Sequence, residues 1–344
     1  MGEQKRINIF IVARAAGVSP STVSRVMNHP GVVEASTRRR VEEAIRDTGY
    51  IRNRAAQAMR GRRSATLGLI VPTVDYSIFA SLVQSFGETA SELGFTLLLA
   101  AHGYDLEQEY AILRKFLEHR VDGVALIGLD HTEDSFGLLA SQDTPAIEVW
   151  NYGTSGPLPT VGARNDLAGA LAARHLVDLG HRDIALLFPP SSDNDRSRSR
   201  QSAALSVFAA AGIDIPQERR AVSEYDIGRA RLAAERLFDT PRRPTAIFCG
   251  NDVIVRGALY AALARGMRVP EDLSVMGVGD FHGSADMVPA LSTVRIPAAE
   301  IGSEAARQLV GMIASDGQTA PGREFLPEVV ARDTTARPHR ERHT

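Results

Sequence analysis

The sequence predicts two parts of different fold class: a small all-α head at the N-terminus and a larger α/β body. Three observations lead to this prediction. The first 50 residues carry only short helical patterns, whereas from residue 65 short apolar runs alternate with longer helical patterns. The charge divides similarly, because residues 1–63 hold 13 Lys and Arg against 5 Asp and Glu and the rest holds 26 against 36. A length of 344 residues leaves room for two or three domains.

The composition is that of a soluble globular protein, with 44% hydrophobic and 23% charged residues. No apolar run reaches the roughly 20 residues that a membrane span needs, and the first residues lack the apolar core of a signal peptide. We therefore expect a cytoplasmic protein with no membrane partner. Cys249 is the one cysteine, which excludes an intrachain disulfide and a cysteine zinc site. We expect no metal and no cofactor.

The sequence of the head, residues 1–50, predicts three short helices. Asn8 and Ser19 fit the N-caps of helices over about 9–16 and 20–27, and a third helix covers about 35–48. A tight glycine turn joins the first two helices. Such a unit is a helix-turn-helix, whose second helix enters the major groove of DNA.

The second helix has an inward apolar face and an outward polar face. Val23, Val26 and Met27 have inward spacing, which leaves Ser21, Thr22, Ser24 and Arg25 on the outer and flanking faces. Arginine can make two parallel bonds to guanine, and short hydroxyl side chains can bond phosphate oxygens. The basic excess of the head also indicates a polyanionic partner. A solvated basic arm is the alternative interpretation of the charge.

Three stretches closely resemble the head of the LacI/GalR-type bacterial transcription repressors: VARAAGVSPSTVSRVMN (12–28), TRRRVEEAIRDTGY (37–50) and NRAAQAM (53–59). The resemblance implies base reading by Pro20, Ser21 and Arg25. It also implies a hinge helix and linker over 51–64, with Met59 as an apolar wedge between base pairs; a linker helix that is apolar on one side is the alternative. The DNA-binding residues we expect are Ser19, Pro20, Ser21, Thr22, Ser24, Arg25, Asn28, Arg52, Asn53, Arg54, Ala56 and Met59.

The body alternates strands and helices. Apolar runs such as 65–71, 95–100 and 123–128 are separated by helical patterns, which predicts parallel sheets with helices on both faces. Two such units follow one another, with a break near 160–165. A ligand would bind between the two lobes, since ligands of open α/β sheets bind at the carboxyl ends of strands. The sequence has neither a Walker loop nor a nucleophile elbow, so we expect no enzyme.

Segments such as LGLIVP (67–72), AIFCGND (246–252) and PALSTVRIP (289–297) resemble the effector domain of the same family, which is similar to periplasmic sugar-binding proteins. The resemblance implies a two-lobed, periplasmic-binding-protein-like sensor and dimerisation domain over 65–332. Three crossings between lobes are then expected, near 161–165, 291–295 and 321–326. The lobes would cover about 65–162 with 293–322 and about 163–291 with 323–332, followed by a flexible tail over 333–344.

The same resemblance implies eight effector-binding residues: Tyr76, Phe79, Trp150, Arg164, Arg200, Asn251, Asp252 and Asp280. Alternatives stay open. Phe79 and Trp150 could be core residues, Asp252 a helix cap and Arg164 an exposed charge at the lobe joint. Arg196 or Arg198 could serve instead of Arg200.

Two departures from the family pattern suggest the class of effector. Arg164 stands where the family often has aspartate, and Gly279 replaces another aspartate. Because arginine pairs with carboxylates, we expect an anion. The segments HGYDLEQEYAILRKFL (102–117) and GDFHG (279–283) resemble the gluconate-sensing branch, so a sugar acid such as gluconate is the first hypothesis.

We therefore expect a sequence-specific transcriptional regulator, most simply a repressor, that binds palindromic double-stranded operator DNA as a homodimer and responds to a small sugar-like effector. A sugar or sugar-acid receptor without a DNA role is the alternative, and an enzyme on the same scaffold is a third hypothesis. The tail over 334–344 lacks the leucine heptads of a tetramerising coil, which favours a dimer. The operator and the sign of the effector's action stay open.

Overall fold

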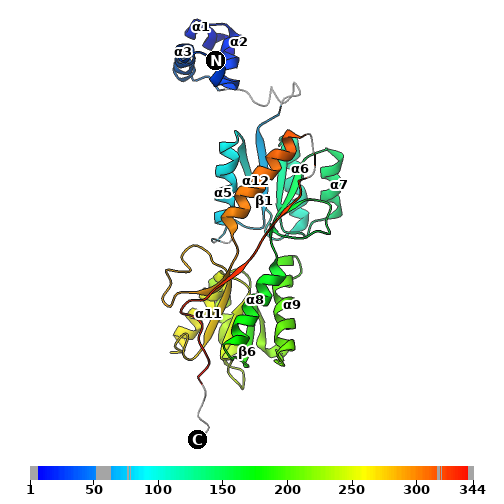
Figure 1. Ribbon diagram of the computed structural model, residues 1–344, viewed down its shortest axis with the longest axis vertical. Helices are drawn as coiled ribbons and strands as arrows, with labels where there is room; N and C mark the ends of the chain where they lie inside the picture. Colours follow the sequence, from blue (N-terminus) through cyan, green and yellow to red (C-terminus); the bar gives the residue numbers. More distant parts are fainter. Residues whose placement is uncertain are drawn as a thin grey trace, which may run out of the picture. The chain divides into compact units, whose positions relative to one another are not determined.

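The computed structural model describes residues 7–51, 63–75, 77, 79–315, 318 and 320–339. The chain divides into two compact units, which meet in the sequence between Ser64 and Ala65 (Figure 1). Among the described residues, no helix is long and apolar enough to cross a membrane.

The first unit holds α1 (Ile9–Ala16), α2 (Pro20–Asn28), a 3-10 turn (Pro30–Val32) and α3 (Ala35–Thr48). The predicted N-caps are confirmed: Asn8 accepts from the backbone N–H groups of Phe10 and Ile11, and Ser19 accepts from that of Thr22. Gly17 ends α1 in the left-handed conformation, at φ 65°, which glycine adopts without steric cost. The buried core of this unit consists of Val12, Ala13, Ala16, Val23, Val26, Val41 and Ala44.

The second unit has two lobes, each built on a six-stranded sheet. The first sheet has the order β11-β5-β4-β3-β1-β2 and is entirely parallel. Its strands are β1 (Thr66–Val71), β2 (Thr96–Ala101), β3 (Gly123–Ile127), β4 (Ala146–Asn151), β5 (Thr160–Ala163) and β11 (Arg323–Phe325). One face packs on α5 (Ala80–Glu92) and α12 (Ala298–Ala314), and the other on α6 (Leu106–Glu118) and α7 (Glu133–Ser141).

The second sheet has the order β12-β10-β9-β8-β6-β7, with β12 antiparallel to β10. Its strands are β6 (Ile184–Phe188), β7 (Arg220–Val222), β8 (Ala246–Cys249), β9 (Ser274–Gly279), β10 (Ser292–Arg295) and β12 (Glu328–Val330). One face packs on α8 (Asn165–Asp178) and α9 (Asp195–Ala210), and the other on α10 (Ile227–Phe238) and α11 (Asp252–Ala264). Parallel sheets covered on both faces are what the strand–helix alternation predicts.

The chain crosses between the lobes three times. The first crossing follows β5, within the expected range. The second follows β10, because residues 292–295 pair with residues 276–279 of the second sheet. The third follows β11, whose residues 323–325 pair with β5 of the first sheet. The expected lobe boundaries at 293 and 323 therefore move to about 296 and 326, since strand pairing rather than local pattern decides them.

The first residues of the expected flexible tail over 333–344 are bonded to the second lobe. Thr334 is fully buried, and its hydroxyl donates to the carbonyl of Val275 at 2.8 Å. The ring of His181 lies 2.9 Å from the carbonyl of Ala336, and that of His175 lies 2.9 Å from the Thr335 hydroxyl. The two histidines of the HLVDLGH segment thus have a structural role in anchoring residues 334–336.

Candidate DNA-binding helix and effector cleft

The polar face of α2 is open to solvent. Ser19, Ser21 and Arg25 are exposed, and Pro20, Thr22, Ser24 and Asn28 are half-buried. The hydroxyls also shape the helix start, because Oγ of Ser19 lies 2.7 Å from Oγ of Ser21 and 2.9 Å from Oγ1 of Thr22. The Asn28 amide donates to the carbonyl of Ser24 at 2.7 Å, at the last turn. A short helix with a buried valine pair and an exposed arginine can present polar groups to a duplex.

The remaining DNA-binding residues expected from the sequence cannot be placed. Arg52, Asn53, Arg54, Ala56 and Met59 lie outside the described residues, as does Tyr76 of the expected effector site.

A buried chain of hydrogen bonds between polar side chains at strand ends and helix starts links the two lobes of the second unit. Arg200, on α9, donates from Nε to Oδ1 of Asn165 at 2.7 Å and from Nη1 to the carbonyl of Gly250 at 2.9 Å. The Asn165 amide in turn donates to Oδ1 of Asn151 at 3.0 Å. Because Asn151 ends β4 and Asn165 starts α8, this chain of bonds joins the two lobes.

Arg200 is a buried cation bonded only to neutral groups. It is 4% exposed, and in the described part of the chain no carboxylate lies within hydrogen-bonding distance of it. Burial lowers the pKa of Arg200 to about 10, which is still far above neutrality. Arg196 differs, because its Nη1 pairs with Oδ1 of Asp195 at 2.9 Å.

Two tyrosines meet between the lobes. Tyr104 follows β2 in the first lobe and Tyr225 follows β7 in the second, and their rings stack with centroids 5.4 Å apart. The Tyr225 hydroxyl accepts from the Asn194 amide at 2.9 Å. The Tyr104 hydroxyl is buried, and this burial, together with the Tyr225 side chain beside it, raises the pKa of Tyr104 well above the ordinary value.

A cavity of about 350 Å³ adjoins this tyrosine pair, which is the size of a small-molecule site. Four carboxylates lie in its wall, at Asp75, Asp193, Glu224 and Asp226. The other lining residues are Thr73, Gly103, Tyr104, Pro190, Ser192, Asn194 and Tyr225. The lining comes from both lobes, so a molecule held there would contact both.

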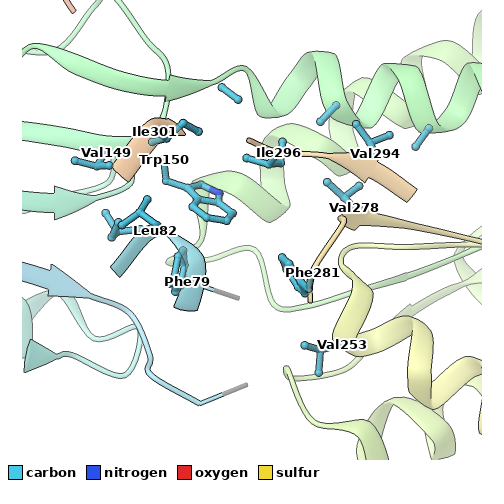
Figure 2. Close-up of a cluster of buried hydrophobic side chains, with 14 of the residues drawn as sticks. Phe79, Leu82, Val149, Trp150, Val253, Val278, Phe281, Val294, Ile296 and Ile301 are labelled. Atoms are coloured by element: carbon cyan, nitrogen blue, oxygen red, sulfur yellow. The ribbon is translucent and has the colours of Figure 1, made fainter. Parts of the chain in front are cut away.

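Phe79 and Trp150 lie in the apolar core at the crossing. They are 3% and 2% exposed, and their rings pack edge to face with centroids 4.9 Å apart. Figure 2 shows these two rings on the first-lobe side, with Val278, Phe281 and Ile296 on the second-lobe side. Both rings thus contribute to the apolar core, as the core alternative expects.

Three of the charged residues expected to bind effector have protein partners. Asp252 is fully buried and accepts from the N–H of Phe281 and the hydroxyls of Ser284 and Thr293. The carboxylate of Asp280 pairs with two arginines of its own lobe, Arg295 at 2.8 Å and Arg332 at 2.7 Å. Arg164 is half-exposed and pairs with Asp166. These pairing partners were not readable from the sequence, and effector binding by the three residues stays a prediction.

Asn251 has one side-chain atom that caps a helix and another that is unpartnered among the described residues. Its Oδ1 caps α11 by accepting from the N–H of Ile254 at 3.0 Å, so Asn251 rather than Asp252 is the cap. Its amide nitrogen is buried without a hydrogen-bond partner among the described residues. Effector binding through that donor stays a prediction.

Sequence reasoning missed Tyr104, Asn151, Asn165, Asn194 and Tyr225. One signal could have found the tyrosines. Tyr104 precedes Asp105, the N-cap of α6, and Tyr225 precedes Asp226, the N-cap of α10. Each tyrosine also follows a strand at the edge of its sheet, β2 or β7. Equivalent positions at two sheet edges indicate residues that face each other across a cleft.

Comparisons with known proteins agree with this architecture. The family model for bacterial regulatory proteins of the lacI family matches residues 9–53, and the model for periplasmic binding protein-like domains matches residues 173–335. The transcriptional regulator DegA of Bacillus subtilis is 31% identical over 336 residues, which covers 96% of this chain and 98% of DegA. The chain belongs to the LacI family.

Two further relatives agree. The transcriptional repressor PurR of Erwinia tasmaniensis is 29% identical over 94% of this LacI-family chain and 96% of its own length. A crystal structure of the Lac repressor dimer bound to operator and the anti-inducer ONPF has a TM-score of 0.83 at 26% identity, over 96% of this chain and all of that chain. The chain is thus a DNA-binding transcriptional repressor of the LacI family with a ligand-binding sensor domain. Its relatives are transcriptional regulators and not enzymes.

Proposed function

We propose that this LacI-family regulator controls its operator in response to a small anion, a sugar acid such as gluconate, bound between the lobes. The observation that carries the proposal is the buried Arg200 guanidinium, which bonds to an amide oxygen and a carbonyl but to no carboxylate in the described chain. An uncompensated buried charge is costly, and a carboxylate ligand would offset that cost. Arg196 does not serve as well, since Asp195 already neutralises it.

We expect the hydroxyls of a sugar acid to bond to polar groups between the lobes. The Asn251 amide nitrogen is buried and unpartnered among the described residues, and the Tyr104 side chain lines the cavity. The carboxylates in the cavity wall can accept from further hydroxyls. A polyhydroxylated carboxylate uses both kinds of group, whereas a compact inorganic anion uses only the arginine.

A thermal-shift panel tests the effector class. We expect gluconate to raise the melting temperature of the full-length protein in a concentration-dependent manner, and glucose, its neutral counterpart, to do so far less. Phosphate serves as the control for charge alone. Equal stabilisation by glucose and gluconate would refute an anion-specific cleft.

We infer that α2 reads base edges, with Pro20, Ser21 and Arg25 in the groove and Ser19, Thr22, Ser24 and Asn28 on the backbone. The solvent-facing placement of these side chains supports the assignment. Arg52, Asn53, Arg54, Ala56 and Met59 complete the proposed surface at the hinge.

Selection from a random duplex pool with the full-length protein should enrich a palindrome, and enrichment of an asymmetric site would contradict a symmetric pair of heads.

We propose a homodimer formed through the sensor domain, acting in the cytoplasm where the operator lies. Its support is a set of exposed apolar side chains on the second lobe. Tyr260 and Leu263 on α11 are 53% and 74% exposed, and Val288 is fully exposed. Large apolar side chains at such exposure are typical of association surfaces.

A further inference from the structure

The start of α9 is bonded directly to the other lobe. Oδ2 of Asp195 accepts from the backbone N–H of Leu129 at 2.8 Å and from the Asn151 amide. One turn later, Nη2 of Arg198 lies 2.8 Å from both carboxylate oxygens of Asp130. Leu129 and Asp130 belong to the loop after β3 of the first lobe, whereas α9 belongs to the second. Both contacts therefore bridge the cleft.

The loop after β3 is shaped to receive α9. Gly128 has φ 106°, a conformation that side-chain-bearing residues rarely adopt. A Cβ built on Gly128 would lie 2.5 Å from Nη1 of Arg196 and 3.3 Å from Oδ1 of Asp195. The backbone conformation at Gly128 thus favours glycine, and a side chain there would displace the Arg196 guanidinium.

A buried pair supports the loop from behind. Nδ1 of His131 lies 2.7 Å from Oε1 of Glu109, and Nε2 lies 3.3 Å from the carbonyl of Gly128. Both side chains are buried, at 0% and 1% exposed. The loop is therefore bonded to its own lobe as well as to α9.

We propose that the loop Gly128–His131 and the α9 residues Asp195, Arg196 and Arg198 form an interlobe latch, which holds the lobes closed and thereby sets the effector affinity without contacting the effector. The proposal rests on the effector cleft of the proposed function. If only a fraction of the molecules is closed, the apparent effector affinity is the affinity of the closed form multiplied by that fraction. Weakening the latch should then lower the affinity for every effector by the same factor.

The latch also acts on DNA binding. An effector alters operator affinity only through its different affinities for the two lobe arrangements. A latch that favours the closed arrangement shifts the same equilibrium. Loss of the latch should therefore change operator affinity, without effector, in the direction opposite to the change that the effector causes.

The test is a charge exchange in the full-length protein. Arg198→Asp and Asp130→Arg each replace an attraction across the cleft by a repulsion, and the double variant restores the pair in reverse. We expect each single variant to weaken gluconate binding about 5- to 10-fold and the double variant to recover most of it. Arg268→Asp is the matched control, because Arg268 pairs bidentately with Asp272 inside the second lobe. It should leave binding unchanged.

Small-angle scattering without effector provides a readout that does not depend on the effector's identity. The Arg198→Asp protein should scatter as a more open particle than the wild type and the Arg268→Asp control. If Arg198 bound the effector directly, exchanging the two charges would not restore binding. Recovery in the double variant therefore distinguishes a latch from direct effector binding by Arg198. If the double variant is as open as the singles, or Arg198→Asp behaves like the control, the latch is refuted. If the latch responds as expected while gluconate fails to bind, only the effector class is wrong.

Gly128→Ala tests the buried part of the latch. The added methyl group would collide with the Arg196 guanidinium, so we expect at least a 10-fold loss of gluconate affinity with an unchanged circular dichroism spectrum. Unchanged affinity in a folded Gly128→Ala protein would overturn the claim that the lobes approach at this loop.

Discussion

At the scale of single residues, some charges of the second unit are balanced by protein partners and others lack a partner of opposite charge. Asp252, Asp280 and Arg164 have protein partners, whereas Arg200 has none of opposite charge in the described structure. Residue type alone does not distinguish these cases. Burial together with the identity of the bonded group does, because a buried charge without a counter-ion raises the free energy of the empty protein.

Arg25 is the residue for which DNA specificity can be tested most directly. It is exposed on α2, in reach of a groove. Replacing Arg25 by Ala should cost about 1–3 kcal/mol of binding to the selected palindrome and much less to scrambled duplex. Arg54→Ala, at a proposed phosphate contact, should weaken both duplexes similarly and reduce the salt dependence. Equal losses on both duplexes for Arg25→Ala would contradict a base-reading role.

Glu148, on β4, gives the stability a predictable pH dependence. It is 1% exposed and one carboxylate oxygen has no hydrogen-bond partner among the described residues. Burial raises the pKa of Glu148 from 4.5 to about 7; His131 opposes this rise, and the carboxylates of Asp195 and Glu109 add to it. The folded protein thus keeps a proton that the unfolded chain releases near pH 4.5. The contribution of Glu148 to the free energy of unfolding is therefore full below pH 4.5 and is lost as the pH rises to about 7.

Denaturant unfolding of Glu148→Gln between pH 4.5 and 8 measures this effect. Through this group, the unfolding free energy of the wild type should fall by up to about 1.4 kcal/mol per pH unit as the pH rises. Gln resembles the protonated acid, so the variant should not show this fall. It should therefore exceed the wild type in stability at pH 8 and match it near pH 4.5. A difference between the two proteins that does not vary with pH would show that Glu148 is ionised in the folded state at all these pH values.

At the scale of elements, the packing of α8 against α9 positions the proposed effector arginine. Gly169 on α8 lies against the backbone of Arg200 on α9, and a Cβ there would overlap the Arg200 carbonyl oxygen. Because Asn165 lies in the first turn of α8 and Arg200 in the second turn of α9, the spacing of the helices decides where these two side chains meet.

Gly169→Ala tests this spacing. We expect a loss of about 1–3 kcal/mol in unfolding free energy, because overpacking a tight helix contact forces the backbones apart, together with a weaker response to gluconate. Gly137→Ala on α7 is the control. No atom lies within 4 Å of its added Cβ, so the variant should be neutral or slightly more stable. A Gly169→Ala protein as stable as this control would show that the helices can separate at no cost.

At the scale of the whole molecule, the proposed homodimer would let two copies act together on DNA. Two heads would then read the two halves of a palindrome, and linkage of two weak contacts raises the affinity well above that of one. The proposed dimer surface on α11 therefore affects DNA binding although it contains no DNA-binding residue.

Leu263→Asp should dissociate the dimer. Leu263 is 74% exposed, and a charge at the centre of an apolar interface opposes association. Analytical ultracentrifugation should show monomers at micromolar concentration, and operator affinity should fall at least 10-fold with the effector site intact. Leu232→Asp on α10, which is 52% exposed, is the control and should remain dimeric. A Leu263→Asp protein that stays dimeric would place the interface elsewhere.

The sequence by itself determined the fold class, the helix-turn-helix and most element positions. Asn8, Ser19 and Gly17 act within a few residues of themselves, as do the apolar periods of helices and strands, so these signals need no tertiary structure. Only the tertiary structure decided that Tyr104 meets Tyr225, that Asp280 pairs with Arg332, and that residues 292–295 join the second sheet. The physical reason is that the energy of a buried polar group depends on which distant strand end lies beside it, and no local pattern along the chain records that neighbour.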